Sequence, residues 1–188
     1  MEEILKNIYD ISSAAKLYRN KTNFIKSLVG SGTYGELTQK GVDAVVSKFK
    51  KYFNSETVFY DLGSGLGKMV THVGVQYGIK KSVGIEYSKE RHECALYIKE
   101  NYLGDYNNIE FICGDFNKVG FSDATVIYMD NTAYPDAISE KIYEGIPSGC
   151  LLIYKRKLFF PIEETQEYQK SGFERTYDQS NLQWFIKK

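Results

Sequence analysis

The feature that most constrains the fold is a glycine-rich loop that joins an apolar strand to a helix. Residues 57–62 are an apolar run typical of a buried strand, and this run leads into Asp61-Leu62-Gly63-Ser64-Gly65-Leu66-Gly67. Three glycines allow the backbone to turn sharply and to approach a ligand closely. A strand, a glycine-rich turn and a helix in this order predict a parallel α/β sheet with a ligand at the carboxyl ends of its strands.

The rest of the chain continues the alternation of strands and helices. Further strands are predicted at residues 82–87, 109–113, 125–129 and 150–154, with helices after residue 67, after Ser88 and over 136–145. Residues 172–177 and 182–187, separated by 178–181, are predicted to form an antiparallel hairpin. The expected fold is therefore α/β and Rossmann-like, with a mostly parallel seven-stranded sheet closed by this C-terminal hairpin.

The N-terminal part has a different pattern. Apolar residues at helical spacing predict a helix within residues 2–18, residues 30–35 are predicted as a loop, and Thr38 is placed to cap the next helix. With 188 residues the chain has the length of one domain. We expect an N-terminal helical segment with a covering loop at 1–36 and one compact domain at 37–188.

Composition excludes several classes of protein. The 24 basic and 24 acidic side chains cancel, and the only dense basic run is Lys155-Arg156-Lys157. The start of the chain lacks the features of a signal peptide, and no apolar stretch is long enough to span a membrane. Three cysteines without a C-x-x-C pattern predict neither disulfides nor a metal site. We therefore expect an intracellular protein of the nucleus or cytoplasm.

The spacing of the glycine-rich loop bears on the ligand. A nicotinamide dinucleotide loop is normally G-x-G-x-x-G, whereas here the spacing is G-x-G-x-G, with Lys68 where the third glycine would fall. Asp61 at the strand end is also expected to lie close to the ligand. A carboxylate there suits a cationic ammonium and sulfonium better than a diphosphate, which favours S-adenosyl-L-methionine.

Two further strand ends carry residues suited to an adenosine. Glu86 ends the second strand roughly 25 residues past Asp61, near the spacing of a ribose-binding acid. This carboxylate fits either NAD or S-adenosylmethionine. After the third strand, Asp115 could accept from an adenine amino group while Phe116 packs on the ring. Glu86 therefore indicates adenosine and not a particular reaction, whereas a dehydrogenase does not need the pair Asp115 and Phe116 at this place.

A fourth segment, residues 129–135, follows the fourth strand. Its Asn131 and Tyr134 could orient a nucleophilic nitrogen and shield a developing cation. The sequence Asn131-Thr132-Ala133-Tyr134 also resembles the Asn-Pro-Pro-Tyr motif of adenine and glutamine amide methyltransferases, although Thr132 and Ala133 replace the rigid prolines. Both nucleophile classes stay open at this point.

Five segments, taken in order along the chain, resemble one known family. They are Tyr34-Gly35-Glu36, Asp61–Gly67, Gly84-Ile85-Glu86, Gly114-Asp115-Phe116 and residues 126–134. The chain resembles the non-SET histone lysine methyltransferases of the disruptor-of-telomeric-silencing family over roughly residues 30 to 160. The Tyr-Gly-Glu sequence and residues 126–134 are the discriminating parts, because the glycine-rich loop is shared with many methyltransferases.

The resemblance implies a class I methyltransferase that uses S-adenosyl-L-methionine, with the loop at 34–38 folded over the methionine end. The implied cofactor-binding residues are Tyr34, Gly35, Glu36, Thr38, Asp61, Gly63, Ser64, Gly65, Gly67, Lys68, Glu86, Asp115, Phe116 and Asn131. The implied catalytic residues are Asn131 and Tyr134, which would line a lysine channel, together with Tyr34. Leu37 stands where the family has Thr, and Lys68 where it has Gln.

The expected function is therefore protein lysine N-methylation of a histone, such as a core lysine of histone H3, or of another protein. Alternatives are an adenine or glutamine amide N-methyltransferase and a non-catalytic cofactor-binding scaffold. The expected partner is a protein substrate such as a histone or a nucleosome. Neither strong intrinsic DNA binding nor membrane association is expected. His72 and His92 are expected to be surface or packing residues and not catalysts.

Overall fold

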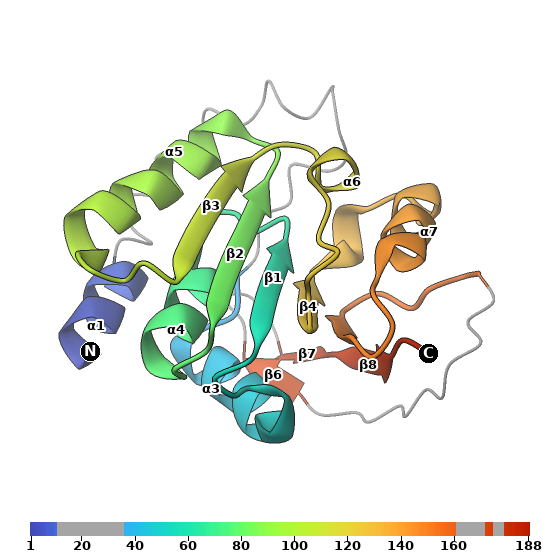
Figure 1. The fold of residues 1–188 in the computed structure, drawn as a ribbon, viewed down its shortest axis with the longest axis horizontal. Coiled ribbons are helices and arrows are strands. Elements are labelled where there is room, and N and C mark those ends of the chain that lie inside the picture. Colours follow the sequence, from blue (N-terminus) through green and yellow to red (C-terminus); the bar gives the residue numbers. More distant parts are fainter. Residues whose placement is uncertain (11–35, 161–171, 175–178) are drawn as a thin grey trace.

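A computed structural model describes residues 1–10, 36–160, 172–174 and 179–188 (Figure 1). Its helices are α1 (Glu2–Asp10), α3 (Gln39–Lys48), α4 (Lys68–Gln76), α5 (Lys89–Ile98), α6 (Phe116–Val119) and α7 (Asp136–Gly145). Its strands are β1 (Val58–Leu62), β2 (Lys81–Glu86), β3 (Ile109–Cys113), β4 (Val126–Met129), β5 (Leu151–Tyr154), β6 (Gly172–Glu174), β7 (Gln179–Asn181) and β8 (Gln183–Ile186). Short 3-10 turns lie at Lys50–Tyr52 and Asn131–Ala133, and a π-helical turn at Lys99–Leu103 extends α5.

The main sheet has the strand order β3-β2-β1-β4-β5-β8. The first five of these strands are parallel to their neighbours, and β8 is antiparallel to β5. The chain runs outward from β1 to β3 on one side and then returns to β4 on the other, so the order reverses between β1 and β4. Ligands bind at such a switch point in doubly wound sheets. The predicted α/β, Rossmann-like fold is confirmed.

The C-terminal strands pair differently from the hairpin expected between residues 172–177 and 182–187. In the described residues β6 pairs with β7, and β7 lies in the stretch that was expected to form the turn. The main sheet of these residues has six strands, whereas seven were expected. The reason is the open edge of β5, whose backbone groups need partners. β8 supplies them, and Phe185 is completely buried on one face while Trp184 packs on the other.

Side chains of each central strand alternate between two hydrophobic clusters, one on each face of the sheet. Phe59 contributes to the cluster covered by α1, α3, α4 and α5, whereas Val58 and Tyr60 contribute to the cluster that contains Ile142 of α7. Figure 1 shows α1, α4 and α5 together on one side of the sheet and α7 on the other. Burial on both faces is what holds the strand ends, and hence the site, in fixed positions.

Capping side chains explain where two helices begin. Thr38 accepts a hydrogen bond from the backbone N–H of Gly41 at the start of α3, and Ser88 accepts one from Arg91 at the start of α5, as the sequence predicts. The predicted N-terminal helix is present as α1, with Leu5 and Ile8 buried. The remainder of that prediction, and the loop at 30–35, lie outside the described residues. The division into 1–36 and 37–188 stays a prediction.

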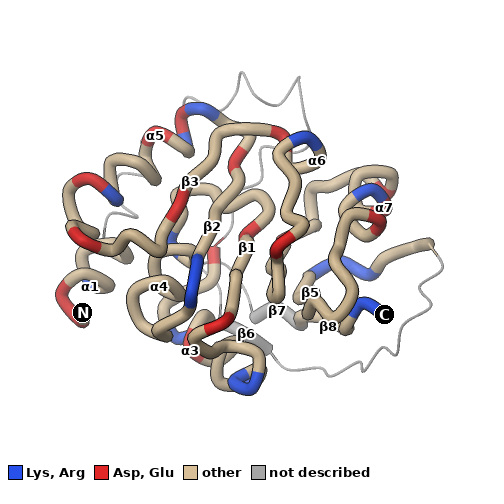
Figure 2. Tube along the Cα trace, viewed as in Figure 1, with Lys and Arg blue, Asp and Glu red and all other residues tan. Residues whose placement is uncertain are grey.

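Charged residues of both signs are mixed along the described trace, and the run Lys155-Arg156-Lys157 follows β5 (Figure 2). In α5, for example, Lys89, Glu90, Arg91 and Glu93 alternate in sign. Among the helices that the structure describes, none combines the length and apolarity needed to cross a bilayer.

Candidate functional site

The register of the sheet brings the predicted strand-end residues to one edge. Leu62 of β1 pairs with Ile85 of β2 and with Met129 of β4. Glu86 and Asp130 are the next residues along β2 and β4, so both lie level with the start of the glycine-rich loop. This edge holds the carboxyl ends of β1 to β4 (Figure 1). The sequence-predicted segments therefore converge where a doubly wound sheet binds its ligand.

The glycine-rich loop depends on glycine for conformation and for packing. Gly63, Gly65 and Gly67 have φ values of 87°, 58° and 76°, a region that other residues adopt at a cost. A Cβ atom on Gly67 would lie 2.3 Å from the Phe111 ring, and one on Gly63 would lie 2.1 Å from the Tyr134 hydroxyl oxygen. The loop is thus closely packed on its neighbours at both ends.

Ser64, a predicted cofactor residue, turns its hydroxyl toward β2. A Cβ atom built on Gly84 would lie 2.6 Å from Ser64 Oγ, so the serine side chain lies against that strand. The structure thus places the Ser64 side chain beneath the loop. A contribution of Ser64 to ligand binding through its backbone stays a prediction.

Glu86 connects the glycine-rich loop to the end of β2. Its Oε2 accepts a hydrogen bond from the backbone N–H of Gly65 at 2.8 Å, and its Oε1 accepts one from that of Ser88, also at 2.8 Å. Arg91 Nη1 lies 3.7 Å from Oε1. Because the side chain is buried and held from both sides, its carboxylate has a fixed direction at the switch point.

Asp61 is a buried carboxyl group in strongly negative surroundings. Its side chain is buried at the end of β1. Burial raises the pKa of Asp61 well above its usual range, and the negative charges of Glu86, Asp130 and Glu36 raise this pKa further. Four acidic groups therefore share one small region, which favours a cationic ligand group at the strand ends.

Lys68 provides a buried cation next to these acids. It is the first residue of α4 and is 3% exposed, and its Nζ lies 2.7 Å from Glu36 Oε2. A buried lysine is stable only with such a partner. The acids are not arranged as metal ligands: in the described part of the chain, no group of three or more His, Cys, Asp or Glu side chains could hold a metal ion. The edge thus presents separate acidic and basic positions.

The predicted adenine residues lie at the start of α6. Asp115 caps this helix by accepting from the backbone N–H of Asn117 at 3.0 Å. Phe116 packs against Tyr134, with ring centroids 5.5 Å apart, and the Tyr134 hydroxyl donates to the Leu62 carbonyl oxygen at 2.7 Å. The two aromatic residues therefore meet directly over the glycine-rich loop.

The Tyr134 phenol stays protonated in this environment. Burial raises its pKa well above the usual range, and the charges of Glu86, Asp61 and Asp130 add to the effect. Tyr134 therefore acts as a hydrogen-bond donor and an aromatic surface, and not as a base.

Asn131 is completely buried and joins two loops at the carboxyl edge. Its Oδ1 accepts from the backbone N–H groups of Lys155 at 3.2 Å and Arg156 at 2.6 Å, and its Nδ2 donates to the Arg156 carbonyl oxygen at 2.8 Å. The amide thus fixes the loop after β4 against the loop after β5. Its predicted role in a lysine channel stays a prediction.

Replacing Asn131 with alanine is expected to lower the free energy of unfolding by about 1–3 kcal/mol, because buried backbone groups of Lys155 and Arg156 lose their partners. Urea unfolding monitored by circular dichroism measures this loss. Thr132→Ala is the matched control, since Thr132 is an exposed neighbour whose hydroxyl bonds only locally to Asp130. Equal stability losses in the two variants would contradict the assigned role of Asn131.

Other predicted residues have different positions. Tyr34 and Gly35 lie outside the described residues. Thr38 caps α3, as described above, so its observed contact is structural. Sequence reasoning missed Arg156, whose guanidinium donates to the Tyr134 carbonyl oxygen and to Asp136, each at 2.6 Å. Only its place in the basic run after β5 distinguished it in the sequence.

Comparisons with known proteins place the chain in a family. The family described as "Histone methylation protein DOT1" matches residues 12–185. The Caenorhabditis elegans protein named "Histone-lysine N-methyltransferase, H3 lysine-79 specific" is 32% identical over 144 residues, which are 68% of this chain and 15% of that protein. The carboxy-S-adenosyl-L-methionine synthase of Shewanella halifaxensis is 25% identical over 187 residues, covering 90% of this chain and 76% of that protein.

A solved structure with a similar fold is magnesium protoporphyrin IX methyltransferase from Synechocystis PCC 6803 with bound SAM. Its TM-score is 0.63 at 14% identity, with 98% of this chain and 97% of that chain covered. At this identity the likeness concerns the fold. The chain spans only a small part of the length of the C. elegans protein. The family match, in contrast, extends over nearly all of the 188 residues of this chain. The chain therefore belongs to the family of the histone methylation protein DOT1.

Proposed function

We propose that this protein is an S-adenosyl-L-methionine-dependent protein lysine N-methyltransferase that acts on a histone or on another protein. The observation that carries the proposal is the charge arrangement at the carboxyl edge, where Asp61, Glu86, Asp130 and Glu36 lie together and Lys68 is the buried cation beside them. S-adenosylmethionine combines an ammonium, a sulfonium and a carboxylate. The chemistry of these side chains fits all three groups.

In this proposal the predicted residues at the strand ends have defined tasks. Asp61 would attract the cationic methionine end, Lys68 would bind its carboxylate, and Glu86 would accept from the ribose hydroxyls. Asp115 and Phe116 would bind the adenine. The glycine-rich loop would bring its backbone close to the cofactor. The hydrogen bond from the Gly65 N–H to Glu86 keeps this loop beside the proposed ribose-binding acid. The remaining cofactor residues proposed from the sequence are Tyr34, Gly35, Glu36, Thr38, Gly63, Ser64, Gly67 and Asn131.

When bound, the cofactor supplies an electrophilic methyl group on a good leaving group, so the protein's part is positioning and exclusion of water. Tyr134 would place a neutral aromatic surface beside the incoming lysine, and Asn131 would hold the loop that carries Tyr134. An aromatic environment disfavours the ammonium form of the lysine, which must lose a proton before attack. Tyr34 would belong to the same channel. We assign the removal of the proton from the substrate lysine to no particular side chain.

Membership of the DOT1 family supports a protein lysine as the acceptor, and the name of the C. elegans relative, which specifies histone H3, supports a histone as the substrate protein. An amide or adenine acceptor has less support. That chemistry needs the asparagine side chain to face the acceptor, and the Asn131 amide is used by the backbone of Lys155 and Arg156.

Methyl transfer from labelled S-adenosylmethionine tests the proposal, with free histones, nucleosomes and adenine-containing DNA offered in parallel. The expected result is label on a protein lysine, greatly reduced in Tyr134→Ala. Exposed Tyr97→Ala is the matched control and is expected to transfer normally. Label on DNA alone, or on glutamine instead of lysine, would overturn the proposed acceptor.

A further inference from the structure

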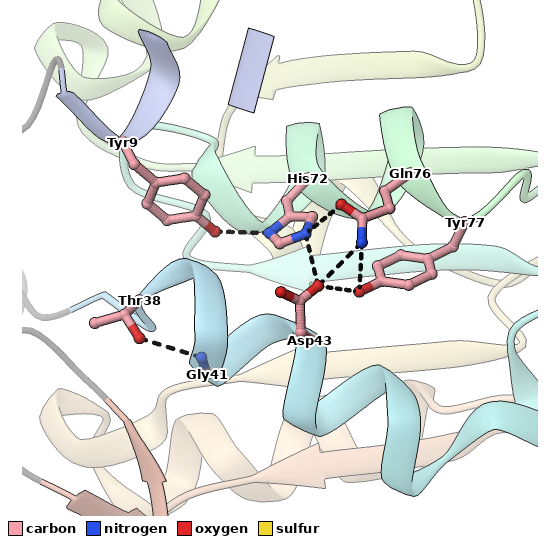
Figure 3. Close-up of polar contacts among 7 residues, drawn as sticks. All are labelled: Tyr9, Thr38, Gly41, Asp43, His72, Gln76 and Tyr77. Atoms are coloured by element: carbon pink, nitrogen blue, oxygen red, sulfur yellow. Dashed lines mark hydrogen bonds and ion pairs between the residues drawn. The ribbon is translucent and has the colours of Figure 1, made fainter. Parts of the chain in front are cut away.

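A polar cluster centred on one buried side chain connects three helices on the face of α4 next to the candidate site (Figure 3). His72 of α4 is completely buried, as a packing residue would be. Around it lie Tyr9 of α1, Asp43 of α3, and Gln76 and Tyr77 at the end of α4. These residues come from distant parts of the chain, so the cluster joins the N-terminal helix to the core.

The hydrogen bonds define how His72 is oriented. The Tyr9 hydroxyl oxygen lies 2.9 Å from His72 Nδ1, and in a neutral imidazole with its proton on Nε2 this nitrogen accepts a hydrogen bond from the hydroxyl. His72 Nε2 lies 3.1 Å from Asp43 Oδ1 and 3.1 Å from Gln76 Oε1, which are both acceptors, so this nitrogen carries the proton. Burial lowers the pKa of His72, which favours this neutral form.

Asp43 anchors the other end of the cluster. Besides His72, its Oδ1 accepts from Gln76 Nε2 at 3.1 Å and from the Tyr77 hydroxyl. Three donors from α4 and its C-terminus therefore converge on one carboxylate oxygen. A polar cluster satisfied in this way fixes one orientation of its members more strictly than apolar packing does.

Tyr9 also reaches the candidate cofactor site. Lys68 and His72 are four residues apart on α4 and therefore lie on the same helix face. The Lys68 Nζ lies 5.8 Å from the centre of the Tyr9 ring and 2.7 Å from Glu36 Oε2. The Tyr9 ring thus covers Lys68, while the Tyr9 hydroxyl is hydrogen-bonded to His72.

We propose that Asp43, His72 and Tyr9 form a positioning chain that holds α1 over Lys68 and so fixes the Lys68–Glu36 pair at the methionine end of the cofactor site. The inference rests on the proposed function. All three are positioning residues, since none is expected to touch the reacting atoms. Their effect should therefore fall on cofactor affinity and leave the methyl-transfer step itself unchanged.

Tyr9→Phe is the sharpest variant, because it removes the hydroxyl that His72 holds and keeps the ring. Loss of this hydrogen bond is expected to raise the KM for S-adenosylmethionine and the dissociation constant for S-adenosylhomocysteine by about three- to tenfold, with kcat within about twofold. Amide hydrogen exchange of residues 2–10 should become faster in the same variant. His72→Leu should give the same pattern, and His72→Asn, which restores an acceptor for Tyr9, should partly rescue it.

The other histidine of the chain, His92 on α5, supplies the matched control, and His92→Leu should leave affinity and exchange unchanged. Faster exchange of α1 in Tyr9→Phe with unchanged affinity for S-adenosylhomocysteine would overturn the positioning role alone. Wild-type protein that binds no S-adenosylhomocysteine would instead overturn the proposed function, and the positioning role with it. Calorimetry on the unmodified chain separates these two results before any variant is compared.

Discussion

Asp61→Asn is expected to stabilise the folded protein at neutral pH and, in the same variant, to weaken S-adenosylmethionine binding at least about 30-fold. The affinity falls because the amide removes a buried negative charge that faces the cationic ligand groups. The stability rises because the amide also removes a charge that is desolvated and lies among Glu86, Asp130 and Glu36. The gain in folding stability and the loss of affinity have one cause, because the buried carboxylate favours ligand binding and disfavours folding.

The pH dependence of stability follows from the same carboxyl group. In the unfolded chain Asp61 titrates near its ordinary value of 3.8, and its pKa in the folded state is well above that. Between the two values the folded state binds more protons than the unfolded state. The contribution of Asp61 to the free energy of unfolding is therefore most favourable at low pH and declines as the pH rises above about 4. Asparagine binds no proton, so in Asp61→Asn this residue causes no decline in the free energy of unfolding as the pH rises.

Urea unfolding of wild type and Asp61→Asn at about pH 5 and about pH 8 measures both effects, because the stability gap should widen toward the higher pH. Asp105→Asn is the matched control at an exposed acid and should show almost no gap. A lower stability of Asp61→Asn at both pH values would show that the ionised carboxylate is favourable in the fold and would contradict the electrostatic description of the site.

Gly67→Ala is expected to lower the free energy of unfolding by about 2–5 kcal/mol, the sum of left-handed backbone strain and overpacking. The residue has φ of 76°, and the new Cβ atom would lie 2.3 Å from Phe111 Cε1 and 3.1 Å from Ala95 Cβ. Both neighbours are buried, so neither can move without disturbing the contact of α4 with α5 and β3.

Gly78→Ala separates the two contributions. Gly78 has φ of 59° and no heavy atom within 4 Å of an added Cβ, so its replacement is expected to cost only the backbone strain, about 1–2 kcal/mol. Urea unfolding gives both values. If Gly67→Ala does not fold, the double variant with Phe111→Leu should recover folding by opening the space. Equal losses at the two glycines would contradict the packing argument.

The strand ends could be located from the sequence because they depend on local patterns. The apolar run before Asp61, the glycine-rich loop and the distance to Glu86 predict successive parallel strands, and register then brings these residues together. The capping roles of Thr38 and Ser88 were accessible for the same reason, since each is decided within four residues.

Contacts between distant segments could not be predicted in this way. The Asn131 amide binds the backbone of Lys155 and Arg156, which only the packing of β5 beside β4 brings within reach, so no local pattern indicates these contacts. Similarly, His72 has no local feature that indicates Tyr9 or Asp43 as partners. The pairing of β6 with β7 was missed because these short polar strands have little alternation, and because β8, which falls within the expected second hairpin strand at 182–187, pairs with the free edge of β5 instead.

The central claim is that the carboxyl edge of this sheet binds S-adenosylmethionine, and calorimetric titration of the wild-type chain tests it most directly. S-adenosylmethionine, S-adenosylhomocysteine and NAD should be titrated separately. Asp61, Glu86 and Lys68 suit a zwitterionic methionine end, so we expect saturable one-to-one binding of the first two ligands and none of NAD. Binding of NAD with no binding of either methionine derivative would contradict the account.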